Sequence, residues 1–420
     1  MGVKLQRQLW MGELTALGVS VLVSAAVWVL PAYSDELSDV RLGSGGLHLA
    51  PFWVQPTVEA GVFYDSLPDA TAGYIAANVE AKSDFNRHAL NFGASAQRYE
   101  YFDSDADEHT NLFGYAENRI DVLHDLTITS GVRGGLFEDS GAADSTTCCS
   151  GCSILSPGAA CLTDISSAPN AAEPVPYSTA DAWSIIRKDF NHIAVTADAL
   201  YSISDYHDVA MIGGGTLDQD FRDGTQYEVG GRLDYIFSPA YSVFARTSYN
   251  QRDYDNGDSH GWRGLGGLAF ELTSLLRGDI GVGYFTQMYD TGTDVSGFSY
   301  HVGLVWNPTM LMTVRVNGDR MVDESDIADS PGSVVSRIEA AIDYEVLRTV
   351  IVTPRFGYAL NDYVDSPLDS QSVWGSVDAQ YYMNDFLSFG FNYTVEKVDY
   401  SGVGTDYDRH LVGVNVKASF

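Results

Sequence analysis

Residues 385–420 read DFLSFGFNYTVEKVDYSGVGTDYDRHLVGVNVKASF and contain two stretches in which apolar and polar residues alternate. Apolar residues take every second position from Leu387 to Val395 and again from Val412 to Phe420. Alternation with period two is typical of β-strands with one apolar and one polar face. The polar face here carries Gly, Ser, Asn and charge, which favours an outward, lipid-facing apolar surface around a polar interior. This stretch therefore predicts a transmembrane β-barrel.

The same unit repeats from Phe52 onward: a strand, a very short turn, a second strand and a long polar loop. The short turns are predicted at 85–87, 124–125, 190–192, 238–240, 276–278, 307–309, 347–348 and 384–385. The long loops are rich in Asp, Gly and Ser, and another loop is expected near 66–71. The pattern gives about 18 antiparallel strands, or about 16 if one hairpin is spurious. The predicted fold class is all-β, with short periplasmic turns and long extracellular loops.

Composition restricts the partners of this 420-residue chain. It carries 24 Lys and Arg against 56 Asp and Glu, a formal net charge of −32. Binding to nucleic acid needs patches of Lys and Arg, so no nucleic acid partner is expected. An acidic surface favours divalent cations, cationic solutes or simple solubility.

The first 34 residues are predicted to be a signal peptide. Lys4 and Arg7 precede an uncharged apolar run, and small residues allow cleavage before Asp35. A retained membrane anchor is the alternative, because the apolar run is long for a signal core. Residues 35–51 are then a periplasmic N-terminal segment, and residues 52–420 form the outer-membrane barrel.

All four cysteines fall in the loop 139–176, at Cys148, Cys149, Cys152 and Cys161. Their spacing is irregular and no histidine is near, so two disulfides are favoured over a soft-metal site. A bridge between the neighbours Cys148 and Cys149 would be strained. Each is therefore expected to pair with one of the other two, and the sequence does not choose between those connectivities.

Aromatic residues gather at the strand ends. Six tyrosines stand beside acids near the long loops, at Tyr99, Tyr206, Tyr254, Tyr289, Tyr363 and Tyr400. The ends near the short turns carry Phe237, Tyr241, Trp306, Tyr344 and Phe386. Both sets are interpreted as girdles at the level of the lipid headgroups.

Charged residues on the inward parity of the strands are the candidate pore lining: Glu228, Arg232, Asp234, Arg246, Arg315, Asp319, Arg337, Glu339, Asp343, Glu345, Arg355 and Asp378. About the turn at Pro239, Arg232 and Arg246 fall opposite each other. Glu339 falls opposite or diagonal to Arg355. Such pairs can brace the wall or line an aqueous pore. Inward Phe244, Trp374 and Tyr382 are expected to fill space rather than to stack on sugars.

Motifs for other chemistry are weak or missing. Asp103, Asp105 and Asp107 have the opening spacing of a calcium loop, but Glu108 and Gly114 break the pattern. The sequence contains no G-x-S-x-G, H-E-x-x-H or P-loop motif. Neither an enzyme nor a cofactor is expected, and a hydrolase of the outer membrane is the last-ranked alternative.

Several runs resemble one known family. They are YEVGGRLDY (227–235), FARTSYNQRDYD (244–255), SLLRGDIGVGY (274–284), LVWNP (304–308) and YEVLR (344–348). They are similar to an outer-membrane β-barrel porin family, some of whose members are encoded with polysaccharide biosynthesis and export systems. The resemblance spans about residues 52–420 and omits the cysteine loop. It implies an outer-membrane barrel, with a role in exopolysaccharide secretion as one option, and it carries no catalytic residues.

The sequence as a whole predicts a porin-like channel in the bacterial outer membrane, with exopolysaccharide secretion as its most specific version. A closed structural or surface-interaction barrel is the alternative. The expected partners are outer-membrane lipid and lipopolysaccharide, the barrel-assembly machinery acting on Phe420, and polysaccharide or export proteins.

Overall fold

The structure, a computed structural model, describes residues 46–67, 69–102, 108–139, 174–211, 214–255, 257–273, 275–323, 330–401 and 406–420. Its strands are β1 Leu47–Leu49, β2 Phe52–Asp65, β3 Ala70–Ser83, β4 His88–Tyr101, β5 His109–Leu123, β6 Leu126–Asp139, β7 Val175–Asp189, β8 Ile193–Tyr206, β9 Val209–Ala210, β10 Thr216–Leu217, β11 Gly224–Ser238, β12 Tyr241–Tyr254, β13 Ser259–Thr273, β14 Leu276–Tyr289, β15 Val295–Thr309, β16 Met312–Asp323, β17 Ser333–Leu347, β18 Val350–Tyr363, β19 Asp369–Asn384, β20 Leu387–Ser401 and β21 Tyr407–Ser419. One short 3-10 helix, η3, spans Asp220–Arg222.

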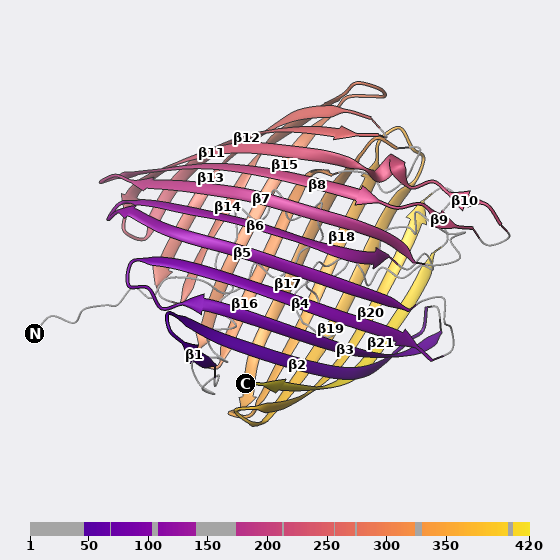
Figure 1. Cartoon of the computed structure of the whole chain (residues 1–420). Coiled ribbons are helices and arrows are strands. Elements are labelled where there is room, and N and C mark those ends of the chain that lie inside the picture. Colours follow the sequence, from indigo (N-terminus) through magenta and orange to yellow (C-terminus); the bar gives the residue numbers. More distant parts are fainter. Residues whose placement is uncertain are drawn as a thin grey trace, which may run out of the picture.

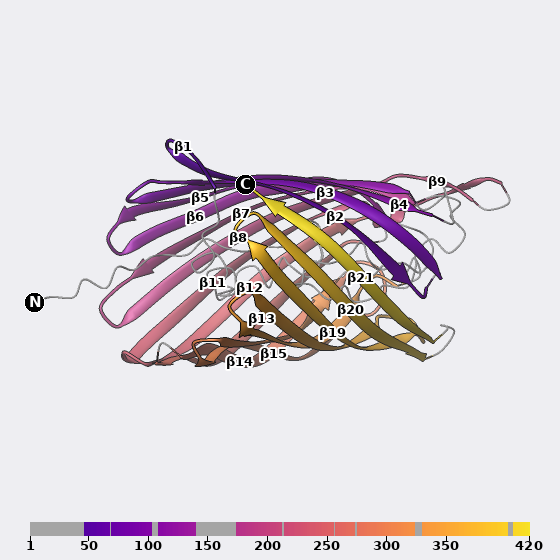
Figure 2. The ribbon, with the colours of Figure 1, turned by 90° about the horizontal axis from the view of Figure 1, so that it is seen from below.

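These strands form one closed antiparallel barrel (Figure 1). Neighbours in sequence pair with each other, and β2 closes the ring by pairing with β21 from Thr57↔Ser419 to Asp65↔Leu411 (Figure 2). The sheet has 19 strands, but β1 only adds a three-residue pairing to the start of β2. The wall therefore has 18 strands, and the prediction of an all-β barrel with that strand number is confirmed.

Two faces of the wall follow from the alternation in each strand. In β8 the odd-numbered residues Ile193, Val195, Tyr201 and Ile203 are exposed on the outside, whereas inward Asp198 and Ser202 are buried. The outward apolar residues are exposed all around the barrel, which is the arrangement of a lipid-facing wall. No helix among the described residues is long and apolar enough to cross a membrane.

Two of the predicted turns were placed wrongly. Residues 276–278 lie inside β14, and the preceding turn falls between Thr273 and Leu276. Asn307 and Pro308 lie at an irregularity in β15, and the turn is Met310-Leu311. Gly and Pro suggested turns there, yet a Cβ on Gly278 would lie 2.3 Å from the Gly303 carbonyl oxygen. This glycine allows two strands to approach closely rather than making a turn. The other six turns lie within two residues of their predicted places.

The interpretation of the loop-end tyrosines as a lipid-facing girdle was wrong. All six have the inward parity of their strands, and Tyr99, Tyr289 and Tyr363 are only 2%, 8% and 6% exposed. Tyr99 stacks on His109 at a ring-centroid distance of 4.5 Å. The position of a residue in the alternation along its strand determines whether its side chain points inward or outward, and its distance from a loop does not. The turn-end set does face outward, since Phe237, Tyr241, Trp306, Tyr344 and Phe386 are 41–55% exposed.

Several sequence predictions concern residues outside the described ranges. These are the signal peptide in residues 1–34, Asp103, Asp105 and Asp107, and the cysteines Cys148, Cys149, Cys152 and Cys161.

Candidate functional site: the charged interior

The inward face of β8, β11, β12 and β14 carries a group of buried ion pairs. Arg232 and Arg246 are register partners, as the sequence predicts. The Arg246 guanidinium donates to both carboxylate oxygens of Asp198, at 2.7 and 3.0 Å. Arg232 donates to Asp234 at 2.9 Å and to Asp279 at 2.9 Å. Each arginine is therefore balanced by a carboxylate and not by a solvent ion.

Sequence reasoning missed the acids Asp198 and Asp279. Asp198 was available from alternation, because β8 places it on the inward parity with Ser202. Asp279 was hidden because its strand was predicted to begin after a turn at 276–278. Placing that turn correctly puts Asp279 on the inward face, beside Arg232.

Aromatic rings pack beneath these charges. The Arg232 guanidinium lies 3.9 Å from the ring centroid of Phe244, which is 4% exposed. Trp374 is also buried and packs on Ala359, while Tyr382 is half-buried. Burial of Phe244 and Trp374 favours a space-filling role over an open stacking platform.

A second group lies on β13, β15 and β16 around Asp319. The Arg263 guanidinium donates to Asp319 Oδ1 at 2.5 Å, and His301 Nδ1 lies 2.8 Å from Asp319 Oδ2. His301 Nε2 lies 3.7 Å from Asp279 Oδ1, which joins this group to the first. Arg337 is the register partner of Asp319, yet no ion pair of Arg337 occurs within the described part of the chain.

Apart from Glu228 on β11, the remaining candidates lie on β16 to β19. Arg315 pairs with Asp343 at 2.7 Å, and Arg355 pairs with Asp378 at 2.7 Å. Glu339 is diagonal to Arg355, because Gly357 is its register partner and Arg355 faces Ala341. The ion pair between Arg355 and Asp378 joins β18 to β19. Glu228 is buried, and Glu345 is partly exposed near the turns.

The interior is packed unevenly along the barrel. Inward Asn317, midway along β16, is exposed. Toward the loops, inward residues such as Gln97, Tyr99, Gln226 and Gln287 are almost fully buried. Water can therefore reach the middle of the barrel, whereas the described wall is densely packed at the loop end.

A distant ion pair closes the ring. Asp65 at the end of β2 is fully buried and accepts two hydrogen bonds of 3.0 Å from the Arg409 Nε of β21. The two residues are 344 positions apart, so no local pattern in the sequence connects them.

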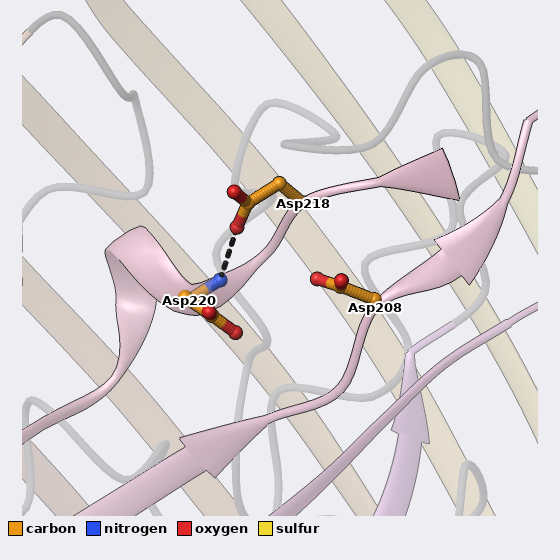
Figure 3. A group of neighbouring side chains, drawn as sticks. All are labelled: Asp208, Asp218 and Asp220. Carbon is orange, nitrogen blue, oxygen red and sulfur yellow. Dashed lines mark hydrogen bonds between the residues drawn. The ribbon is translucent and has the colours of Figure 1, made fainter. Parts of the chain in front are cut away.

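Three exposed aspartates meet on the loop after β8. Asp208, Asp218 and Asp220 can each place one carboxylate oxygen within 4.8 Å of the others. The Asp220 backbone N–H donates to Asp218 Oδ1 at 3.0 Å (Figure 3). Exposed acidic groups of this kind are common without a cation, and we assign none to them.

We expect this loop to become more ordered as the pH falls. Repulsion from Asp218 and Asp208 raises the pKa of Asp220 above its ordinary value. A raised pKa stabilises the folded loop below the ordinary pKa, and that stabilisation is lost as the pH rises through the raised one. Hydrogen exchange of β9 and β10, corrected for intrinsic rates, should show higher protection at about pH 4 than at about pH 7. Asp220→Asn should shrink the difference, and Asp294→Asn in another loop should leave it intact. Equal protection at both pH values would contradict this account.

Comparisons with known proteins agree with the architecture. The sequence model of the family described as Putative beta-barrel porin 2 matches residues 42–151 and 154–420. No curated protein matches the chain.

Solved structures similar to the chain include OccAB2 of Acinetobacter baumannii, with 13% identity, 88% of this chain and 98% of that chain covered, and a TM-score of 0.44. A mutant of the ferric enterobactin receptor PfeA of Pseudomonas aeruginosa has 7% identity, 87% and 80% coverage, and a TM-score of 0.46. The copper transporter OprC has 9% identity, 90% and 81% coverage, and a TM-score of 0.45. No substrate or mechanism transfers at this level of likeness.

Proposed function

The chain belongs to the Putative beta-barrel porin 2 family, and from that premise we propose that it is a passive, porin-like channel of the bacterial outer membrane. The observation that carries the proposal is the exposure of inward Asn317 halfway along a wall lined by charge. A barrel filled by side chains alone would bury this residue. Its exposure supports an interior that holds water, which a conducting barrel requires.

The charge of the lining favours cations. The twelve candidate residues comprise seven carboxylates and five arginines. Most of the arginines are held in ion pairs, and the lining has two more carboxylates than arginines, so acid sets the field that a passing ion meets.

Single-channel recording tests the proposal. The refolded barrel in a planar bilayer should give stable conductance steps, with a reversal potential in a KCl gradient that indicates cation preference. Glu345→Arg should move that potential toward anion selectivity, because it changes the charge of the lining by two units near the turn-side mouth. Asp385→Asn, in the turn between β19 and β20, is the matched control and should leave the potential unchanged.

Recordings without steps above background would refute the open channel. They would favour the second candidate, a closed structural barrel braced by its interior ion pairs. Burial of Arg246 with Asp198 is the observation that favours this alternative.

A role in exopolysaccharide secretion is a narrower form of the proposal and rests on the resemblance of the runs at 227–235 and 274–284. Deletion of the gene should then reduce secreted polysaccharide without reducing its synthesis. Unchanged secretion would refute the role in exopolysaccharide secretion, and the proposal of a general porin-like channel would still stand.

The partners proposed for the barrel follow from its surfaces. The exposed apolar wall fits outer-membrane lipid and lipopolysaccharide. Phe420 is 50% exposed beside β2, where its N–H donates to the Pro56 carbonyl at 3.0 Å. A terminal residue placed on the first strand is suited to contact with the barrel-assembly machinery while the ring closes.

A further inference from the structure

The ladder between β15 and β16 stops early. It comprises seven register pairs and ends at His301↔Asp319, whereas even the closing ladder between β2 and β21 has nine. Beyond that point no register pair joins Val295–Tyr300 to Arg320–Asp323, although all of these residues are described. The wall therefore loses its pairing on the loop side of this interface.

Interior side chains donate hydrogen bonds to backbone carbonyls that would otherwise bond the facing strand. A continued ladder would place Tyr300 opposite Arg320 and Phe298 opposite Val322. Instead, the Tyr300 carbonyl accepts from Arg263 Nη2 at 3.1 Å, and the Arg320 carbonyl accepts from Ser299 Oγ at 2.7 Å. The Val322 carbonyl accepts from Arg252 Nη2 at 2.9 Å. Three backbone acceptors are thus satisfied by side chains inside the barrel and not by backbone N–H groups of the neighbouring strand.

The end of β16 turns into the mouth of the barrel. Val322 packs with Phe285 and Tyr289, which face inward from β14. Neighbouring Val334 and Val335 on β17 are both buried, although their side chains point to opposite faces. A strand buried on both faces lies inside the ring at that level. The described loop-side ends of β16 and β17, at Val322 and at Val334 and Val335, therefore lie inside the ring, behind an unpaired stretch of wall.

The unpaired stretch lies within the membrane span. Trp306 marks the turn-side boundary of β15, and Tyr300 and Phe298 are six and eight residues farther along. With about 3.3 Å per residue and a tilt of about 40°, they stand about 15 and 20 Å above it, inside an apolar band about 25 Å tall. Backbone groups without a hydrogen-bond partner are strongly unfavourable in lipid. The bonds from Ser299, Arg252 and Arg263 relieve that cost, which indicates a built opening and not a defect.

We propose that the wall opens laterally between β15 and β16, and that a single-chain amphiphile passes there between the wet interior and the outer leaflet. On the outside, Tyr284 and Phe298 are 58% and 55% exposed and offer an apolar path. On the inside, Arg263, His301 and Asp319 offer a charged one. A ligand with a polar head and an apolar chain matches both surfaces.

The lower border of the opening is fixed on both faces. Outside, the Tyr300 hydroxyl donates to the Arg337 carbonyl at 3.2 Å and so spans β16. Inside, Asp319 binds Arg263 and His301. The opening therefore extends toward the loops and not toward the turns, and it does not depend on ion conduction along the barrel axis.

Quenching by nitroxide-labelled stearic acid in phosphatidylcholine liposomes tests the opening. A fluorophore is attached to Met321→Cys beside the opening, in a chain whose cysteines 148, 149, 152 and 161 are serine. We expect a loss of fluorescence approaching that of the outward-facing Phe298→Cys. The control is Val305→Cys, which is inward-facing and 4% exposed below the border, and it should keep its fluorescence. All variants must retain the compact, heat-sensitive band on SDS gels.

Each outcome of the quenching experiment either supports or overturns the lateral opening. Absence of quenching at position 321 overturns the proposal. Equal quenching at 321 and 305 also overturns it, because the stearate would then have entered along the axis.

Hydrogen exchange of the unmodified chain in nanodiscs is a check that needs no variant. The amides of Phe298 and Tyr300, which point toward β16, should exchange faster than those of Val302 and Leu304, which point the same way, and equal protection would refute the opening. A barrel that conducts no ions can still give the positive result, so the two proposals fail separately.

Discussion

Replacing Asp65 with alanine is expected to destabilise the folded barrel by about 3–5 kcal/mol, the usual effect of leaving one charge of a buried pair uncompensated. Asp65 is fully buried, and its partner Arg409 is 5% exposed. The pair also joins the first wall strand to the last, so its loss weakens the interface that closes the ring. Urea unfolding of the refolded protein, followed by tryptophan fluorescence and by heat-modifiable migration on SDS gels, measures the change.

Two controls separate the buried charge from charge in general. Asp125→Ala removes a partly exposed partner of Lys188 at the turn end, and it should cost much less than Asp65→Ala because water screens this pair. Asp65→Ala combined with Arg409→Met removes both charges and should recover much of the lost stability. If Asp65→Ala costs no more than Asp125→Ala, the pair does not hold the ring closed.

Gly283→Ala is expected to cost about 3 kcal/mol, at the upper end of the range for overpacking. A Cβ at Gly283 on β14 would lie 1.7 Å from the Gly264 carbonyl oxygen of β13, and 2.9 Å from Leu265 Cα. Both obstacles are backbone atoms, which cannot rotate away as a side chain can. The two strands would have to separate or twist. The same unfolding assay applies.

The matched control lies on the facing strand. A Cβ at Gly264 meets no atom within 4 Å, so Gly264→Ala should change stability by no more than about 0.5 kcal/mol. Similar losses in both variants would show that the conformational preference of glycine, and not the close approach of the strands, determines the effect.

Alternation made the wall predictable. Because successive side chains of a strand point to opposite faces, the sequence alone identified the inward position of Arg232, Arg246 and Phe244. The same signal gave the closed barrel with 18 strands. It did not locate the exact turn between Thr273 and Leu276. The interpretation of Tyr99 and its counterparts was wrong because it followed their nearness to the loops, whereas alternation places them on the inward face.

Partners across the interior depended on the closed ring. Alternation can place a charge inside, but it does not say which of many inward charges it will meet. Asp198 belongs to β8 and its partner Arg246 to β12, with β11 between them. Arg232 reaches over from β11 to Asp279 on β14. The curvature of the wall brings these long side chains close to partners two or three strands away.

The sequence by itself determined the repeated hairpin, the two faces of the wall and the excess of acid in its lining, because each depends only on local order along the chain. The tertiary structure decided that Asp65 meets Arg409, that the described loop-side ends of β16 and β17 turn inward, and that the β15–β16 ladder ends at His301. Those features arise from closing the sheet into a ring, which brings together residues far apart in the chain and sets how far each ladder can extend. Local alternation carries no information about that closure.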